Sequence, residues 1–333
     1  MLYKDRADRI AEVVIAGEAL TLAQFVAVAR YGAKVALSST YKEKVRQGAE
    51  KLQGILDSGK AVYGVNTGFG DNVRFRIGDE DMLRLQENIV RTHACTSGEP
   101  FPVELVRGGL LALILKVGYG YSGVRLAVVE LAAEFLNRGL TPYVPREGMM
   151  MPLTYSAYIA QTLMGEGRFL VGDKAVPAGD ILAQNRLTPI RYGPKEGLAV
   201  IGDTALVAVP ALLAVYELVD TLRHCLVCAA VVTEALRCTD KAFDSRLLAL
   251  KRHPELEEIA TWMRAALTGS EIMEQAREAK VQDATSIRII PHLFGAVFRQ
   301  TAQTYEVIME DMNSVTDNPS FFDGGLALMG ANW

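Results

Sequence analysis

The feature that most constrains the fold of this chain is the spacing of its apolar residues, which recur every three or four positions in segment after segment. That spacing places apolar side chains on one face of an α-helix. The predicted helices of the first half are residues 20–36, 41–56, 79–91, 102–116, 124–137 and 155–164. From residue 198 the pattern continues to about residue 313, with Pro254 and Pro291 near helix starts and a break at Gly269. The sequence therefore predicts a mainly α-helical protein.

Irregular segments separate the predicted helices of the first half. Residues 61–65 form a short strand-like run, and residues 168–176 have the pattern of a β-hairpin. Residues 141–152 hold three prolines and a glycine. We therefore expect a smaller mixed α/β part at residues 1–197 and a bundle of long helices at residues 198–333. Bundles of this kind place active sites between helices and at subunit interfaces.

Composition and charge narrow the function. The chain has 333 residues, half of them apolar, and a formal net charge of −4. It has no basic run, so we expect no nucleic-acid partner. It opens with charged residues rather than a hydrophobic stretch, which predicts no secretory signal and a cytoplasmic location. The apolar stretch at residues 198–219 contains Asp203 and Pro210, so a buried, kinked helix is favoured over a membrane span.

The four cysteines are too few for a disulfide framework in a chain of this length. Cys225 and Cys228 form a C-x-x-C pair that follows His224, a spacing that raises the possibility of a metal site. A zinc site needs further ligands, and only Cys238 lies near in sequence. The surrounding segment is apolar and helix-like. We therefore interpret Cys225, Cys228 and Cys238 as core residues and predict no metal.

A glycine-rich segment carries the most specific signal in the sequence. Residues 62–70 read Val-Tyr-Gly-Val-Asn-Thr-Gly-Phe-Gly. This run matches the signature of the histidine and phenylalanine ammonia-lyases. Further matches follow in the family's order, at residues 85–88, 92–95, 120–125, 144–145, 165–167, 196–199, 281–283, 286–288 and 314–319. The chain thus resembles the aromatic amino acid ammonia-lyase family over nearly its whole length, which implies the fold of the ammonia-lyase/fumarase-like superfamily.

One departure from the family bears directly on the chemistry. The family's lyases carry an Ala-Ser-Gly tripeptide, followed by Asp, that cyclises into an electrophilic methylidene-imidazolone. Between residues 144–145 and 165–167 this chain is three residues shorter and has no such tripeptide. Met149, Met150 and Met151 cannot build the ring, which needs a serine to dehydrate and a glycine amide to cyclise. The resemblance therefore implies a member that has no cofactor.

Two other cofactor-associated positions differ as well. Gly202 replaces the asparagine that contacts the ring, and Thr285 replaces a tyrosine of the catalytic pocket. An alternative is that a modified residue is omitted near Met151 and Pro152, which would make the protein an ordinary histidine ammonia-lyase. Pro152 also stands where the family has an aspartate, and the loss of these three associated positions together favours real loss of the cofactor.

The residues that handle the substrate in the family are retained. By resemblance, Tyr63 is the base that removes the β-proton, His93 contacts an imidazole and Arg288 binds the carboxylate with its planar fork. A free phenol has a pKa near 10, so the base role requires a stabilised phenolate, which loop amides or a helix N-terminus could supply. The structural alternatives are a tyrosine packed beside a turn, a core histidine and an ion-paired arginine.

Five further positions complete the candidate site. Thr285 occupies the place of the pocket tyrosine. Asn66 belongs to the glycine-rich loop, and its structural alternative is to hold the turn. Met150 would help to fill the volume that the ring vacates. The matched pocket residues of less certain role are Gln282 and Asn318.

The missing electrophile predicts a different leaving group. A quaternary trimethylammonium leaves as a neutral tertiary amine without proton transfer and has no lone pair to attack an electrophile, so a base and a carboxylate clamp could suffice. The family contains ergothionase, which releases trimethylamine from ergothioneine to give thiolurocanate. We therefore predict a carbon–nitrogen lyase for a histidine betaine. The alternatives are a histidine ammonia-lyase with its cofactor and a non-catalytic relative.

The resemblance also implies an assembly. The family's active sites are shared between subunits of a homotetramer, so we expect a homotetramer here. The chain stops at Trp333 inside a family motif, and the helices that normally follow contribute an acidic pocket residue. We therefore expect a truncated C-terminus, with partner chains or a separate C-terminal fragment covering the apolar faces.

Overall fold

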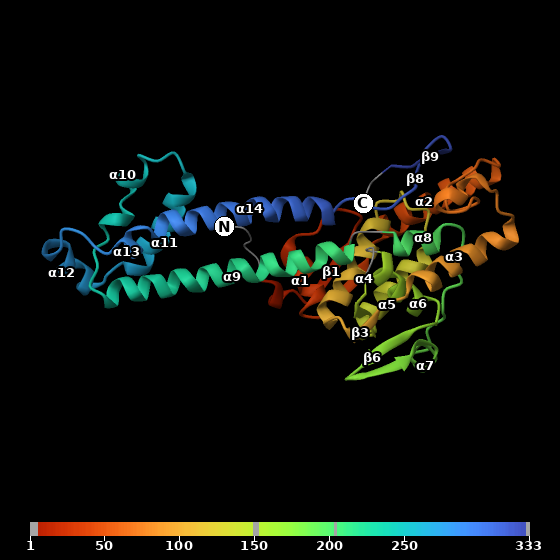
Figure 1. Cartoon of the computed structure of the whole chain (residues 1–333), viewed down its shortest axis with the longest axis horizontal. Helices are drawn as coiled ribbons and strands as arrows, with labels where there is room; N and C mark the ends of the chain where they lie inside the picture. Colours follow the sequence, from red (N-terminus) through yellow and green to blue (C-terminus); the bar gives the residue numbers. More distant parts are fainter. Residues whose placement is uncertain (1–5, 149–152, 203–204, 331–333) are drawn as a thin grey trace. The chain divides into compact units, whose positions relative to one another are not determined.

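The structure is a computed structural model that describes residues 6–148, 153–202 and 205–330 (Figure 1). The chain divides into two compact units. The loop unit comprises Tyr3–Ala211 and Met309–Trp333, and the helical unit comprises Leu212–Ile308 with Met1–Leu2. These units interleave along the sequence. The division of the chain at residue 197 stays a prediction.

The loop unit begins with two parallel strands joined by a helix. Strand β1 (Glu12–Ile15) pairs with β2 (Lys34–Leu37), and α1 (Leu22–Ala29) connects them. Thr21 caps α1 together with Gln24 in a reciprocal capping box. The prediction of one helix over residues 20–36 is therefore wrong in its second half. A glycine at position 32 takes a left-handed conformation and ends the helix, and β2 then finds a hydrogen-bonding partner twenty-two positions earlier.

The other predicted helices of the first half are confirmed. They are α2 (Ser39–Asp57), α3 (Asp79–His93), α4 (Val103–Val117), α5 (Leu126–Arg138) and α6 (Leu153–Leu163). Helix α4 is buried from Val106 to Val117 and packs against α1 and α5, so it forms the centre of this unit. Even Arg107 is buried there, and its guanidinium donates to the carbonyls of Val28 and Leu136.

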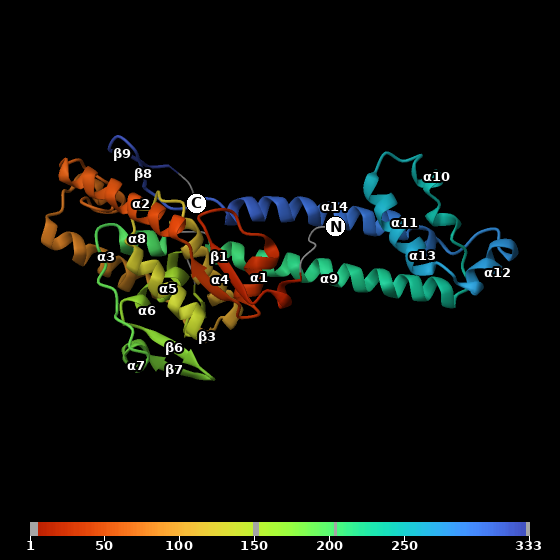
Figure 2. The ribbon, with the colours of Figure 1, turned by 180° about the vertical axis from the view of Figure 1, so that it is seen from behind.

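Short strands complete the loop unit. The hairpin predicted at residues 168–176 is confirmed as β6 and β7, which Figure 2 shows beside α7. Residues 61–65, predicted as a strand, instead form consecutive turns, because the N–H groups of Val65 and Asn66 both donate to the Val62 carbonyl. The remaining elements are β3 (Ser97–Pro100), β4 (Thr141–Pro142), β5 (Pro145–Glu147), β6 (Arg168–Val171), β7 (Lys174–Pro177), α7 (Ala178–Gln184), α8 (Glu196–Ile201), β8 (Ser320–Phe322) and β9 (Leu326–Leu328).

The helical unit is built on two long helices. Helices α9 (Ala205–Ala235) and α14 (Ile290–Met312) run side by side in both ribbon views (Figures 1 and 2). Their far ends carry the short elements α10 (Ser245–Leu248), α11 (Pro254–Leu267), α12 (Glu271–Ala279) and α13 (Thr285–Arg288). These elements enclose a core that includes Phe243, Ile259 and Met263. The predicted helix starts at Pro254 and Pro291 and the break at Gly269 are confirmed.

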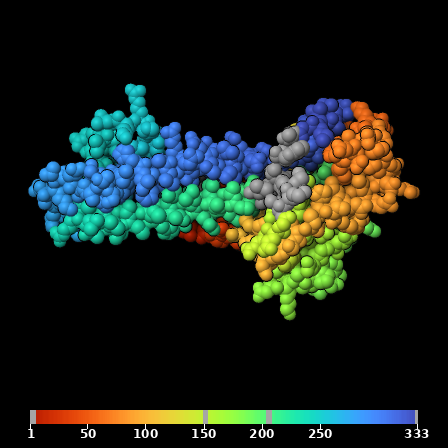
Figure 3. Space-filling model, in the orientation of Figure 1, coloured from red at the N-terminus to blue at the C-terminus, as the bar shows by residue number. Residues whose placement is uncertain are grey.

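The prediction that three cysteines lie in the core is wrong for two of them. Cys238 is buried, whereas Cys225 and Cys228 are exposed on α9. This helix is apolar on several faces, and within its unit only one face is covered, so Leu226 is buried while Val227 is about half exposed. Figure 3 shows one face of α9 and α14 with their side chains.

Among residues 6–148, 153–202 and 205–330, no three His, Cys, Asp or Glu side chains are grouped as they would be to hold a metal ion. None of the helices in those ranges is both long and apolar enough to cross a membrane.

A buried ion pair joins two distant parts of the loop unit. The Lys195 ammonium binds the Asp317 carboxylate, and both side chains are fully buried. Burial, together with the charge of the buried Lys116, lowers the pKa of Lys195 to about 8, although the charge and hydrogen bond of Asp317 oppose the shift. The Lys195 ammonium also lies 5.5 Å from the centre of the Phe321 ring. The pair thus links the start of α8 to the segment that leads into β8.

We expect the substitution Asp317→Asn to lower the free energy of unfolding by about 3–5 kcal/mol, because it leaves the Lys195 charge buried without a counter-charge. Urea unfolding followed by circular dichroism measures this. The matched control is Glu134→Gln, which removes a carboxylate from an exposed pair with Arg138 and should change stability by less than about 0.5 kcal/mol. Equal effects of the two substitutions would contradict the prediction.

Candidate active site

The glycine-rich segment forms a tight loop whose conformation depends on Gly64. Its φ is +63°, in the left-handed region, and a Cβ placed there would lie 2.5 Å from Cε1 of Phe69 and 2.8 Å from Cδ2 of Leu198. Only glycine fits both the conformation and the space. Asn66 holds the turn from inside: its Oδ1 accepts from the Val62 N–H at 2.7 Å, and its Nδ2 donates to the Lys60 carbonyl at 2.8 Å.

Tyr63 lies half-buried beside this turn. Its ring meets Phe69 edge-on, with the ring centres 6.1 Å apart. Its Oη accepts a hydrogen bond from the backbone N–H of Gly70 at 3.1 Å. The loop therefore provides the kind of amide contact that a tyrosine base requires.

Gln86 connects the loop to two helices. It is fully buried on α3, where its Nε2 donates to the Gly64 carbonyl at 2.8 Å and its Oε1 accepts from the Leu198 N–H of α8 at 3.0 Å. Gln86 belongs to a matched motif, at residues 85–88, but the sequence alone predicts no role for it. The available signal was a polar residue on the apolar face of an amphipathic helix.

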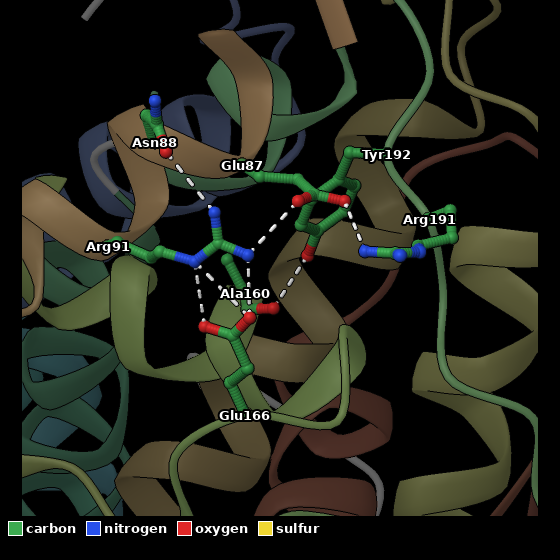
Figure 4. Close-up of polar contacts among 7 residues, drawn as sticks. All are labelled: Glu87, Asn88, Arg91, Ala160, Glu166, Arg191 and Tyr192. Carbon is green, nitrogen blue, oxygen red and sulfur yellow. Dashed lines mark hydrogen bonds and ion pairs between the residues drawn. The ribbon is translucent and has the colours of Figure 1, made fainter. Parts of the chain in front are cut away.

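A network of charged side chains holds α3 in place (Figure 4). Arg91 donates to Glu166, which follows α6, and to Glu87 one turn earlier on α3. Glu87 also accepts from Arg191 at 3.1 Å, in the segment before α8. The hydrogen bonds with Glu166 and Glu87 raise the pKa of Arg91 well above its usual range. The network ties α3 to the end of α6 and to the segment before α8.

His93 is the last residue of α3. Its Nδ1 lies 2.8 Å from the Ile89 carbonyl of the preceding turn, a contact that assigns the proton to Nδ1 in a neutral ring. The other ring nitrogen, Nε2, then presents a lone pair. Asn318 lies in the segment before β8, where its Oδ1 accepts from the Gly330 N–H at 3.1 Å.

In the helical unit, Arg288 organises the other predicted site residues. The Gln282 amide oxygen, oriented toward the guanidinium, accepts from its Nη2 at 2.7 Å and its Nη1 at 2.8 Å. Arg288 also donates to the Thr285 hydroxyl at 3.2 Å and to the Asp283 carbonyl at 3.0 Å. The structure thus brings Gln282, Thr285 and Arg288 into one cluster.

A buried carboxylate anchors the segment that carries this cluster. Asp283 accepts from both the backbone N–H and the hydroxyl of Thr239, each at 2.7 Å. Burial by itself would raise the pKa of Asp283, but the hydrogen bonds from Thr239 and Cys238 outweigh it and lower that pKa. Asp283 therefore stays ionised and ties the segment before α13 to the segment after α9.

The predicted site residues are distributed over both units. Tyr63, Asn66, His93 and Asn318 belong to the loop unit. Gln282, Thr285 and Arg288 belong to the helical unit, and each set is described within its own unit. Met150, predicted to fill the volume vacated by the ring, lies outside the described residues.

The fold and these residues define a class: a mainly helical scaffold with a tyrosine on a glycine-rich loop and an arginine before a long helix. A family model, aromatic amino acid lyase, matches residues 20–333. Histidine ammonia-lyases of Geobacillus thermodenitrificans and Deinococcus radiodurans are 36% and 35% identical to this protein, over 96% and 94% of its chain. The chain belongs to the aromatic amino acid lyase family. It spans 64% and 61% of the lengths of these two relatives.

Solved structures agree on the fold. Tyrosine aminomutase from Streptomyces globisporus matches with a TM-score of 0.89 at 28% identity, over 96% of this chain and 65% of that one. Histidine ammonia-lyase from Trypanosoma cruzi matches with a TM-score of 0.86 at 28% identity, over 96% of this chain and 61% of that one. Ergothionase from Treponema denticola, an ergothioneine-degrading enzyme, matches with a TM-score of 0.89 over 96% of this chain and 65% of that one. Its sequence identity is 22%, so this match shows only that the fold is shared. The predicted fold class is confirmed.

We expect Gly64→Ala to lower the free energy of unfolding by about 2–5 kcal/mol, because a Cβ there adds a clash to the cost of the left-handed conformation. Chemical denaturation measures this. The control is Gly54→Ala in α2, where nothing lies within 4 Å of the added carbon, and there we expect a gain of about 0.5–1 kcal/mol. A Gly64→Ala protein as stable as wild type would contradict the assigned loop geometry.

Proposed function

We propose that this protein is a carbon–nitrogen lyase that eliminates trimethylamine from a histidine betaine such as ergothioneine, giving thiolurocanate, without a methylidene-imidazolone. The observation that carries the proposal is the hydrogen bond from the Gly70 N–H to Tyr63 Oη. It supports a tyrosine base in a chain whose residues do not supply the family's electrophile. The similarity to histidine ammonia-lyases supports a histidine-derived substrate.

The residues of this chain do not fit the ring. The tripeptide's place holds Met149, Met150 and Met151, which have no hydroxyl to lose, and they lie outside the described residues. The asparagine position next to the ring is Gly202, which ends α8 with its N–H on the Leu198 carbonyl. The hydroxyl of Thr285 is engaged with Arg288. We therefore derive no step through that group.

The proposed reaction uses the chain's own side chains. The Tyr63 phenolate takes the β-proton of the substrate, and the electrons of that C–H bond form the new carbon–carbon double bond. The carbon–nitrogen bond breaks, and its electron pair leaves with neutral trimethylamine. Because a quaternary nitrogen carries no lone pair, it has no use for an electrophile. Loss of the phenol proton to solvent restores the base.

Two further side chains would hold the substrate. Arg288 would bind the carboxylate with its planar fork, exchanging its present contacts with Gln282 and Thr285 for two carboxylate oxygens. His93 would face the imidazole-derived ring with Nε2, since Nδ1 is held by Ile89. Such positioning aligns the β-proton with the base, which is where much of an enzyme's rate acceleration arises.

We expect purified protein to convert ergothioneine to thiolurocanate, and the absorbance of thiolurocanate measures this conversion. Tyr63→Phe should lower kcat by about 10²–10⁴-fold, because it removes the oxygen that takes the proton. The matched control is Tyr31→Phe, which alters an exposed tyrosine outside the candidate site and should leave kcat unchanged. Folded protein that releases no trimethylamine from any histidine betaine would refute the proposal.

The second candidate is a histidine ammonia-lyase that forms the imidazolone, favoured by the 36% identity to such an enzyme. Intact mass spectrometry of the purified protein separates the two candidates. We expect the mass of the unmodified sequence, because the chain lacks the tripeptide. A mass above that of the printed sequence by one alanine, one serine and one glycine residue less two water molecules, with urocanate formed from histidine, would favour the second candidate. A third reading, a non-catalytic relative, is supported if wild type binds ergothioneine without turnover and Tyr63→Phe binds it equally well.

We also propose that the protein assembles as a homotetramer with shared active sites and acts in the cytoplasm. Support for the assembly comes from large apolar side chains left exposed on the long helices, among them Val227, Val231, Val232, Leu293 and Val307. Exposed apolar surface of this extent is typical of an interaction face. Light scattering during size-exclusion chromatography tests it, and a stable monomer would contradict it.

A further inference from the structure

The side chain of Gln86 bridges two backbone groups that lie far apart in sequence. It is fully buried, and its amide uses both its ends: the nitrogen donates to the Gly64 carbonyl and the oxygen accepts from the Leu198 N–H. A buried side-chain amide with both ends satisfied has one orientation. If the amide were turned over, its NH₂ group would face the Leu198 N–H, donor against donor, and its oxygen would face the Gly64 carbonyl, acceptor against acceptor. Gln86 therefore specifies the position of each partner.

The packing around this amide leaves little room for adjustment. A Cβ at position 197 would lie 2.1 Å from the backbone oxygen of Gln86, so α8 and α3 meet backbone against backbone. Gly64 itself is enclosed by the side chains of Phe69 and Leu198. The bond from Gln86 thus reaches the residue next to Tyr63 at a point where the loop is tightly surrounded.

The helix that carries Gln86 is itself held from both sides. The residue that follows it, Glu87, accepts from Arg191, and Arg91 one turn later binds Glu166 (Figure 4). The helix ends at His93. One rigid element therefore carries both the imidazole-facing residue and the amide that holds the loop of Tyr63.

We propose that Gln86 is a positioning residue: through the Gly64 carbonyl it sets the place of Tyr63 relative to His93. This inference rests on the proposed role of Tyr63 as the base. Displacing a catalytic group by about 1 Å can cost about 10²-fold in rate. Loss of the Gln86 amide should therefore act on kcat far more than on KM.

The test labels the full-length protein with 3-fluorotyrosine and records ¹⁹F NMR spectra, a readout that does not require turnover. The resonance of Tyr63 is identified by its absence from the Tyr63→Phe spectrum, and the other tyrosines report on the global fold. Q86M, similar in length but without the amide, should shift or broaden the Tyr63 resonance and leave most others in place. With ergothioneine, kcat should fall by about 10²-fold. The matched control Q53M, at an exposed position of α2, should do neither.

A second variant tests the Gly64 contact and does not depend on Q86M being folded. In Q86E a protonated carboxyl can still donate to Gly64 and accept from Leu198, whereas a carboxylate can only accept. The Tyr63 resonance of Q86E should therefore match wild type at low pH and move away as the pH rises between about 5 and 9, since burial raises the pKa of a carboxyl. Q53E should show no such change.

The outcomes separate the inference from the proposed function. A Tyr63 resonance that is unchanged in Q86M, or that does not follow pH in Q86E, would overturn the positioning role. A shift of every tyrosine resonance alike would also overturn it, because it would mean general loosening of the fold. A wild-type protein that turns over no histidine betaine would defeat the proposed function, while the Tyr63 resonance in Q86M would still decide whether Gln86 positions the loop.

Discussion

The buried ion pair between Lys195 and Asp317 is the contact on which the arrangement of the loop unit depends. Two charges removed from water bring little net stability, since their attraction mainly offsets the cost of desolvation. What such a pair provides is a specific partner, because either charge left alone would be costly. It brings the start of α8 to the chain segment 122 residues later. Helix α8 is thereby placed where its Leu198 N–H meets Gln86.

Within each unit, a buried polar side chain anchors the segment that carries the predicted site residues. In the loop unit, an amide on α3 and a glycine in a left-handed conformation determine where Tyr63 lies. In the helical unit, the carboxylate of Asp283 holds the segment that presents Arg288. In both cases a buried polar side chain anchors the segment by hydrogen bonds to backbone groups. Few other arrangements are possible, because a buried polar group without a partner costs its full desolvation free energy.

The reaction proposed for this chain depends on which of the family's site residues it retains. Tyr63 with a donor on its oxygen, His93 at the end of α3 and the Arg288 guanidinium remain. The residues that would form or contact an electrophile are replaced at the methionine run, at Gly202 and at Thr285. An elimination with a good neutral leaving group needs the first set and not the second.

The sequence by itself determined the local structure and the family. Apolar periodicity marks helices such as α2, because each turn of a helix is specified by residues three and four positions apart. The run at residues 62–70 identified the family, and the missing serine was visible without coordinates. The segment at residues 20–36 was misjudged because its strand depends on pairing with β1, which no local pattern records.

Only the tertiary structure decided which polar residues organise the site. The partners of Gln86 lie 22 and 112 positions away, so its role could not be read from spacing along the chain. The exposure of Cys225 and Cys228 likewise depends on which face of an apolar helix is covered within its unit. Periodicity records what a residue's own helix requires, whereas a buried hydrogen bond or ion pair depends on which distant segments the fold brings together.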